Sequence, residues 1–197
     1  MKMGPQQIKE TVDEIMDLYL KHGGDDYIGE PVSQLEHMVQ CAQFAESEGY
    51  DEDVILAAFF HDIGHLCCFV LPNSDMQNMD GYGLADHEKL GSAYLRDKGF
   101  SEKITALVQS HVAAKRYLTF RDPGYYDKLS DASKKTLEHQ GGKMTEEEAR
   151  SFKEDSFSGL YILLRRWDEK AKEQNKPIPD LEKYRQMMVS HLSFQKG

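Results

Sequence analysis

Apolar residues recur at intervals of three and four along most of the chain, and this periodicity constrains the fold more than any other feature. It is the pattern of helices that each bury one face. No stretch shows a convincing alternation of apolar and polar residues, which would predict a half-buried strand. The sequence therefore predicts an all-α protein. No repeat or interdomain linker interrupts the 197 residues, so we expect a single domain over residues 1–197.

The expected helices are bounded by capping residues. Ser33 followed by Glu36 is a capping-box pattern, and Ser101 is a second candidate N-cap. Gly23-Gly24 and Gly99 are expected helix stops. The helices are expected at residues 6–22, 33–49, 52–66, 86–98, 101–116, 145–154, 156–174 and 180–193. Two stretches are expected to be loops: 67–85, rich in Asn, Asp and Gly, and 117–144, which contains DPG and QGG.

Composition narrows the class of protein. The net charge is −10, so neither nucleic acid nor an anionic membrane is an expected partner. No apolar run approaches the roughly 20 residues that span a bilayer, and the polar N-terminus lacks a signal-peptide core. The three cysteines, two of them adjacent, form no disulfide framework, which favours the reducing cytoplasm.

The segment FFHDIGH, residues 59–65, carries the first chemical signal. His61 and Asp62 end an apolar run, where a charged residue is costly to bury without a partner. A metal cation supplies such a partner, and imidazole with carboxylate suits iron, manganese or zinc. Taken alone, the His-Asp pair is equally well explained by a structural role.

Four further residues turn the pair into a pattern. His37, His87, His111 and Asp168 each interrupt or border an apolar helical stripe. Each alone is typical of a satisfied core or surface residue, but the order H…HD…H…H…D predicts a metal centre. Four of the six residues suffice for one ion, so the remaining histidines predict a second ion, with Asp62 bridging the two. Coordination rich in His makes magnesium a poor candidate and iron a reasonable one.

This order of residues resembles the HD-domain mixed-valent di-iron oxygenases. Several longer stretches resemble the members that cleave the carbon–phosphorus bond of 1-hydroxy-2-aminoethylphosphonates. They are YIGEPVSQLEH (27–37), HDIGH (61–65), HVAAKRYL (111–118), LSDASKKTLEHQGG (129–142) and RRWDEKAK (165–172). The resemblance runs from about residue 26 to the C-terminus and implies a single helical bundle with two metals in its core.

The resemblance also implies the roles of the site residues. One iron would be held by His37, His61, Asp62 and Asp168, and the other by Asp62, His87 and His111. The phosphonate would be received by His65, Lys115, Ser133 and Arg165, with Tyr27, Glu30 and Gln34 at the other end of the substrate. Asp62, Tyr27 and Glu30 would act in catalysis. The Fe(II)/Fe(III) pair would use O2 as co-substrate, and an upstream hydroxylase would supply the hydroxylated organophosphonate.

Spacing independently favours part of this assignment. Lys115 lies four residues after His111, Arg165 three residues before Asp168, and His65 four residues after the first histidine of HDIGH, so each shares a helix face with a candidate ligand. Arg is well suited to a tetrahedral oxyanion. For these residues a solvated helix face is the ordinary alternative; for Ser133 it is a cap or turn, and for Tyr27 the core.

The amine of the substrate is a finer question. Phe59-Phe60 precede the His-Asp pair, and the long 67–85 loop carries Phe69, Met76 and Met79. Aromatic surface suits a quaternary ammonium through cation–π attraction. We therefore expect 1-hydroxy-2-(trimethylammonio)ethylphosphonate, giving glycine betaine and phosphate, with the primary amine, giving glycine, as the alternative. Such aromatic residues are, however, more often part of a core.

Three other functions fit parts of the pattern. A metal-dependent HD phosphohydrolase would activate water on a nucleotide or phosphomonoester, and anaerobic assay separates it because hydrolysis needs no oxygen. A polyol oxygenase would have little use for Tyr27 and Glu30 at an amine end. A non-catalytic module with a decayed site would not be expected to keep the complete ligand set.

Overall fold

The computed structural model describes residues 3–27, 29–71, 79 and 84–194, and within them the predicted all-α fold is confirmed. The only β pairing among the described residues is an isolated bridge between Asp26 and Ser33. The helices are α1 (Pro5–His22), α2 (Gln34–Ser47), α3 (Glu52–Phe60), α4 (Gly64–Cys67), α5 (His87–Asp97), α6 (Glu102–Arg121), α7 (Tyr125–Lys128), α8 (Asp131–His139), α9 (Glu146–Glu154), α10 (Ser158–Lys170) and α11 (Glu182–Phe194).

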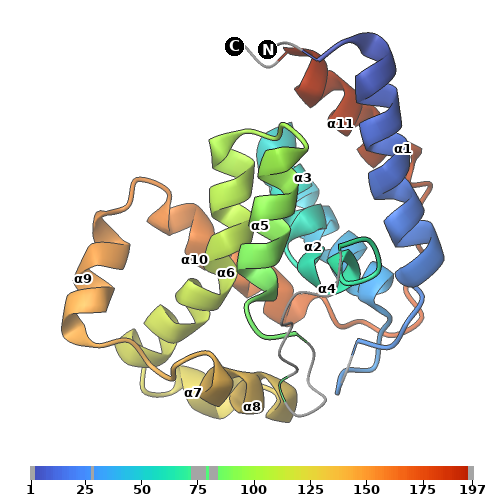
Figure 1. Cartoon of the computed structure of the whole chain (residues 1–197). Helices are drawn as coiled ribbons and strands as arrows, with labels where there is room; N and C mark the ends of the chain where they lie inside the picture. The colour runs from blue at the N-terminus through green and yellow to red at the C-terminus, as the bar shows by residue number, and fades with distance from the viewer. Residues whose placement is uncertain (1–2, 28, 72–78, 80–83, 195–197) are drawn as a thin grey trace.

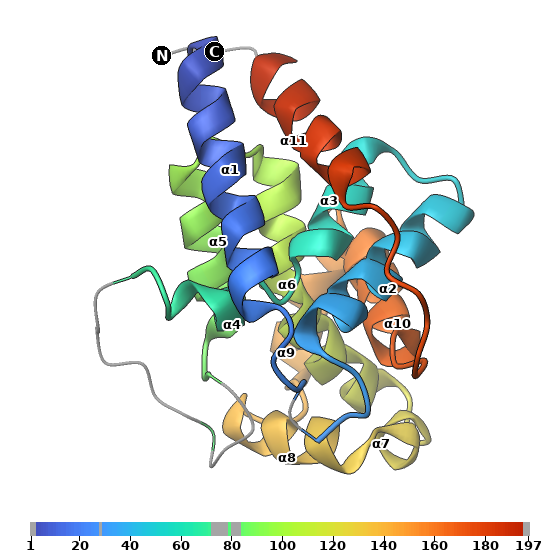
Figure 2. The ribbon, with the colours of Figure 1, turned by 90° about the vertical axis from the view of Figure 1, so that its right-hand side faces the viewer.

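Five helices form the centre of the molecule. Helix α5 packs along α6, α2 packs along α3, and α10 lies against both α6 and α2. Helices α1 and α11 lie side by side on one flank, whereas α7, α8 and α9 lie on the other side of the central helices (Figures 1 and 2). No helix among the described residues has both the length and the apolar character needed to cross a membrane.

The capping signals are confirmed. The Ser33 hydroxyl accepts from the backbone N–H of Glu36 at 3.2 Å, and the Glu36 carboxylate accepts from the backbone N–H of Ser33 at 2.7 Å. The Ser101 hydroxyl caps α6. Gly23 follows the last residue of α1, and Gly99 ends the turn after α5 with φ of +88°, a conformation that favours glycine. These caps fix where α2 and α6 begin, and both helices carry candidate ligands.

The helix expected at 52–66 is wrong in its second half. Helix α3 ends at Phe60, residues 61–63 form a turn, and α4 begins at Gly64. A Cβ atom on Gly64 would lie 1.9 Å from the carbonyl oxygen of His87, so only glycine allows the start of α5 to approach this closely. The break in the helix thus brings His87 beside Asp62.

The loop expected at 117–144 is also wrong. Helix α6 continues to Arg121, and α7 and α8 follow it. Helix α8 begins at Ser130, whose hydroxyl accepts from the backbone N–H of Ser133 at 3.2 Å. It buries only Ala132 and Leu137, too few apolar residues to make a recognisable helical period. At α10 the reverse error occurs, because the helix ends at Lys170 and not at residue 174.

Candidate metal centre

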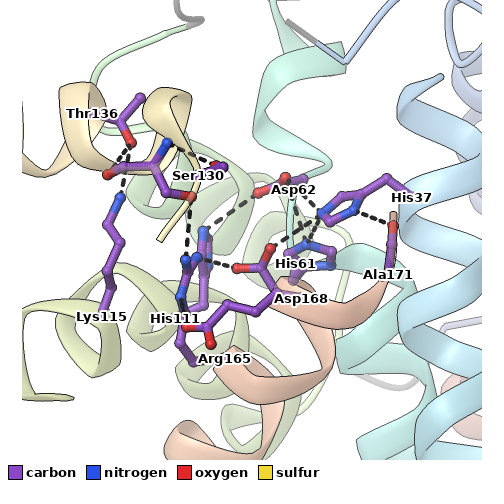
Figure 3. Close-up of polar contacts among 12 residues, drawn as sticks. His37, His61, Asp62, His111, Lys115, Ser130, Thr136, Arg165, Asp168 and Ala171 are labelled. Atoms are coloured by element: carbon purple, nitrogen blue, oxygen red, sulfur yellow. Dashed lines mark hydrogen bonds and ion pairs between the residues drawn. The ribbon is translucent and has the colours of Figure 1, made fainter. Parts of the chain in front are cut away.

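All six predicted ligands converge in the core (Figure 3 labels all but His87). His37 comes from α2, the His61-Asp62 pair from the turn after α3, and His87 from the first residue of α5. His111 comes from α6 and Asp168 from α10. Each of the six is at most 5% exposed. Residues up to 131 positions apart in the chain, from 37 to 168, therefore share one buried site.

The Asp62 carboxylate lies between two groups of ligands. Its Oδ1 atom lies 3.3 Å from Nε2 of both His87 and His111. Its Oδ2 atom lies 3.6 Å from Nε2 of His37 and 3.5 Å from Nε2 of His61. On the Oδ2 side, Asp168 Oδ1 lies 3.3 Å from Nε2 of His37. Each carboxylate oxygen of Asp62 thus faces its own pair of imidazoles.

Backbone carbonyls set the tautomer of all four histidines. The Nδ1 atoms of His37, His61, His87 and His111 lie 2.8–3.0 Å from a backbone carbonyl oxygen. A carbonyl can only accept, so each Nδ1 carries a proton. In a neutral imidazole the Nε2 atom then offers a lone pair to the site. This is the arrangement that orients histidine as a metal ligand.

Each of the two pairs of imidazole rings needs a cation between its two Nε2 atoms. Nε2 of His37 lies 3.0 Å from Nε2 of His61, and Nε2 of His87 lies 3.0 Å from Nε2 of His111. Two lone pairs at this distance repel unless a proton or metal ion lies between them. Asp62 Oδ2 is, in addition, a buried oxygen with no hydrogen-bond partner among the described residues. Two buried cations, one for each pair, would satisfy all these atoms.

The charges of the site agree with metal binding. Burial lowers the pKa of His61 to about 4, so its imidazole is neutral near pH 7. Burial opposes ionisation of Asp62, but the surrounding His61, His111 and His87 hold its pKa well below the usual range. Burial also opposes ionisation of Asp168, yet the neighbouring Arg165 and His37 hold the pKa of that carboxyl well below the usual range. Burial opposes protonation of His37 and His87, yet the neighbouring Asp168 and Asp62 carboxylates raise the pKa of these two imidazoles above the usual value. Neutral imidazoles and ionised carboxylates are the forms that bind metals, so metal binding would displace protons from His37 and His87.

His65 lies beside this cluster but has the opposite tautomer. The rings of His65 and His87 are stacked, with centroids 4.1 Å apart. Ligand atoms of Asp62, His65 and His87 lie within 4.8 Å of one another, so distance alone would permit a third ligand role. However, Nδ1 of His65 accepts from the backbone N–H of Leu84 at 3.4 Å. Burial lowers the pKa of His65 to about 3, so its Nε2 carries the proton and is a donor.

A cavity of about 70 Å³ adjoins the cluster, and all seven predicted substrate residues line it. Four candidate ligands, Asp62, His87, His111 and Asp168, also face it. The predicted substrate residues are Tyr27, Glu30, Gln34, His65, Lys115, Ser133 and Arg165. The structure thus brings these side chains together, as the spacing of His65, Lys115 and Arg165 and the family resemblance led us to expect, while their roles as ligands and substrate contacts stay predictions.

One wall of the cavity is basic. The Lys115 side chain is 3% exposed and its ammonium donates to the Thr136 hydroxyl at 2.9 Å (Figure 3). Burial and the nearby Arg165 lower the pKa of Lys115 to about 7. The Arg165 guanidinium is paired with Asp168, and its Nη2 points toward the Ser133 hydroxyl at 3.5 Å. This wall suits an anion bound beside the metals.

Tyr27, Glu30 and Gln34 also line the cavity. The Tyr27 ring stacks on His37, with centroids 4.1 Å apart. Burial and the nearby carboxylate of Asp62 raise the pKa of the Tyr27 hydroxyl well above its usual range, so it stays protonated. Gln34 Oε1 is buried with no hydrogen-bond partner among the described residues, so a ligand with a donor could satisfy it.

Three polar residues at this site were missed by the sequence reasoning. Ser130 donates to the Glu30 carboxylate at 2.6 Å, Lys172 donates to the same carboxylate at 2.5 Å, and Thr136 accepts from Lys115. Ser130 and Thr136 belong to the region expected to be a loop. Ser130-Asp131 is a helix-start signal that could have revealed α8; no sequence signal singles out Lys172.

The expected aromatic contribution to the pocket is wrong where it can be tested. Phe59 and Phe60 are fully buried and do not line the cavity. Phe59 stacks on Tyr19 and Tyr184, with centroids 4.4 Å away in both cases. From the 67–85 loop, Phe69 stacks on His22, at a ring distance of 3.7 Å, and Met79 lines the cavity. Met76 lies outside the described residues.

The chain belongs to the HD-domain family. The family model described as "HD domain" matches residues 35–184, which include all six predicted ligands. The fold and the cluster therefore define a helical HD-domain protein with a candidate metal centre.

Three relatives support this placement. The chain is 42% identical to the uncharacterized protein L432 of Acanthamoeba polyphaga mimivirus, over 95% of this chain and 84% of that protein. It is 37% identical to the [1-hydroxy-2-(trimethylamino)ethyl]phosphonate dioxygenase (glycine-betaine-forming) of Leisingera caerulea, over 91% and 87% of the two chains. It is 38% identical to the hydroxymethylphosphonate dioxygenase of Gimesia maris, over 89% and 85%. The resemblance to HD-domain phosphonate oxygenases is thereby confirmed.

Proposed function

We propose that this protein is an O2-dependent oxygenase that holds two iron ions and cleaves the C–P bond of a 1-hydroxyphosphonate, releasing phosphate. The observation that carries the proposal is the position of the basic wall. His65, Lys115 and Arg165 face the same small cavity as Asp62, His87 and His111. A phosphonate bound there would bring its adjacent carbon and hydroxyl to the metals. Two relatives named as phosphonate dioxygenases support this class of reaction.

The donor set fits iron. Four imidazoles and two carboxylates around two positions are rich in nitrogen, whereas magnesium and calcium prefer oxygen ligands. One ion would be held by His37, His61 and Asp168, the other by His87 and His111, with Asp62 shared between them. When bound, the iron pair supplies the redox chemistry with dioxygen.

The protein's own residues bind and orient the substrate. Lys115 and Arg165 supply positive charge to the phosphonate, and the Nε2–H of His65 adds a neutral donor. Ser133 Oγ adds a further polar contact on the same wall. Lys115 and Arg165 are buried, so their charges act at low dielectric, which strengthens their hold on the anion. Tyr27, protonated and stacked on His37, would limit the access of water to the predicted ligands.

A separate question is which group, if any, the substrate carries on a second carbon. The expected trimethylammonium relied on Phe59 and Phe60, and neither ring reaches the cavity. The two named relatives act, by their names, on a trimethylated substrate and on hydroxymethylphosphonate, which has no amine. For the two substrates that carry an amine, an upstream hydroxylating enzyme would supply the 1-hydroxy group.

The test is phosphate release with and without oxygen. Protein prepared with ferrous iron should contain about two irons per chain and release phosphate from a 1-hydroxyphosphonate only when oxygen is present. Partly oxidised protein should also show the half-integer-spin resonance of a coupled Fe(II)/Fe(III) pair. Active protein with a single zinc, or rapid anaerobic hydrolysis of a nucleotide, would instead make it an HD phosphohydrolase.

A further inference from the structure

Glu30 already has a counter-ion in this protein. Its side chain is 8% exposed, and its Oε1 atom accepts from the Lys172 ammonium at 2.5 Å and from the Ser130 hydroxyl at 2.6 Å. Glu30 lines the cavity, whereas Lys172 is not among the described lining residues. The charge that Glu30 would offer to a substrate amine is therefore already neutralised.

Lys172 is held in place from both sides. The backbone oxygen of Ala171 accepts from Nδ1 of His37 at 2.9 Å. The side-chain amide of Gln40 makes two bonds to the backbone of Glu173, at 2.8 and 2.9 Å. Both tethers lead to α2, the helix that also carries a predicted iron ligand. The backbone on either side of Lys172 is therefore fixed relative to α2.

Within the described part of the cavity lining, no other carboxylate is available to a cation. Among the described lining residues, the acids besides Glu30 are Asp62 and Asp168, which face the histidine cluster. A substrate with an ammonium or trimethylammonium group would have to displace Lys172 or sit beside its charge. Displacement would leave a lysine that is 18% exposed without its partner, which is costly.

We infer that Lys172 is a specificity-determining residue: as the resident counter-ion of Glu30, it selects 1-hydroxyphosphonates that carry no cationic group, such as hydroxymethylphosphonate. The inference rests on the proposed function. Lys172 acts through Glu30 and so positions the charge of the pocket without touching the phosphonate.

The test compares three substrates on the iron-loaded protein with oxygen: hydroxymethylphosphonate and the primary and trimethylated 1-hydroxy-2-aminoethylphosphonates. The wild type should show its highest kcat/KM with hydroxymethylphosphonate. Lys172→Met frees the charge of Glu30, and should shift the ratio of kcat/KM toward the two cationic substrates by about 10- to 100-fold, the worth of one charge-assisted contact. Anaerobic calorimetry should show the same shift in dissociation constants without turnover.

Two variants separate this effect from simple damage. Lys172→Arg should keep the wild-type preference, because it keeps the charge. Lys176→Met removes a neighbouring lysine that pairs with Glu173 at 3.6 Å, and should leave the ratio unchanged. The double variant Glu30→Gln with Lys172→Met should lose the gain toward cationic substrates.

Each outcome decides a different point. A wild type that prefers either cationic substrate refutes the role of Lys172 and leaves the oxygenase proposal intact, even where Lys172→Met does not fold. An unchanged ratio in a folded Lys172→Met protein also refutes it. Turnover of none of the three substrates refutes the proposed function, and the calorimetric order of affinities then still tests Lys172.

Discussion

Lys115 is kept in the core at a cost to the free protein. Burial and Arg165 lower its pKa to about 7, far below the ordinary lysine value of 10.5. Between these two values the unfolded chain binds more protons than the folded one, so this lysine makes stability rise with pH. Near pH 7 the buried charge of Lys115 therefore lowers the free energy of unfolding, and a bound anion would offset this loss.

We predict opposite effects of Lys115→Met on stability and on binding. The free energy of unfolding at pH 7 should rise, on the order of 1–3 kcal/mol, because an apolar side chain replaces a buried ammonium. Phosphonate affinity, measured by anaerobic calorimetry, should fall about 10- to 100-fold. Both irons should remain bound.

The matched control is Lys135→Met, an exposed lysine on α8. This variant should change neither the free energy of unfolding nor the phosphonate affinity. If Lys115→Met instead lowered stability and released metal, Lys115 would be a structural support of the cluster and not an anion-binding residue.

At the scale of elements, the approach of α4 to the start of α5 positions half of the metal centre. A Cβ on Gly64 would lie 1.9 Å from the His87 carbonyl oxygen and 2.7 Å from its carbonyl carbon. These are backbone atoms, so they yield only if α5 moves. We predict that Gly64→Ala displaces His87 from Asp62, lowers the iron content toward one per chain, and destabilises the protein by about 1–3 kcal/mol.

Gly159→Ala is the control for this substitution. Gly159 lies in α10, and a Cβ there would meet nothing within 4 Å. Because alanine favours helix over glycine by about 1 kcal/mol, this variant should be as stable as the wild type or more so, with both irons. A Gly64→Ala protein with two irons and an unchanged melting temperature would contradict the role given to the close approach.

The sequence predicted most helices to within a few residues, in the centre and at the periphery, but missed α7, α8 and the end of α3, for a physical reason. Helices α2 and α6 bury apolar stripes, which leave a clear period of three and four, whereas α3 buries every residue from Val54 to Phe60 and so gives no period that marks its end. Helix α8 buries only Ala132 and Leu137, so its period is too weak to read. The six His and Asp positions were recognisable because polar groups interrupted those stripes.

What could not be read from the sequence depends on contacts between distant segments. Lys172 and Glu30 are 142 positions apart, and nothing local marks them as a pair. The expectation for Phe59 and Phe60 failed because an apolar run gives no sign of whether a ring faces a core or a cavity. That the whole chain forms a single domain stays a prediction.

At the scale of the molecule, one histidine connects the outer helix α11 with the central helices. The Nδ1–H of His191 donates to Asp53 on α3 at 2.8 Å, and its Nε2 accepts from the backbone N–H of Ser101, the cap of α6, at 3.1 Å. The His191 ring also stacks on Phe100. This contact joins three helices, and α3 and α6 lead into the metal centre.

The Asp53 carboxylate should make this junction sensitive to acid. Its hydrogen bond to His191 lowers the pKa of Asp53 below the ordinary aspartate value of 3.8. A carboxyl with a lowered pKa in the folded state contributes stability above its unfolded pKa and loses that contribution as pH falls through the folded value. We therefore predict that Asp53→Asn is less stable than the wild type by roughly 0.5–1 kcal/mol near pH 7, and that the difference disappears below about pH 3.8.

Urea unfolding of both proteins between neutral and acid pH measures this difference in the free energy of unfolding. Asp97→Asn, at an exposed position, is the control, and its difference from the wild type should not vary with pH. A difference for Asp53→Asn that persists or grows at low pH would mean that the charge of Asp53 does not hold α11 against α3.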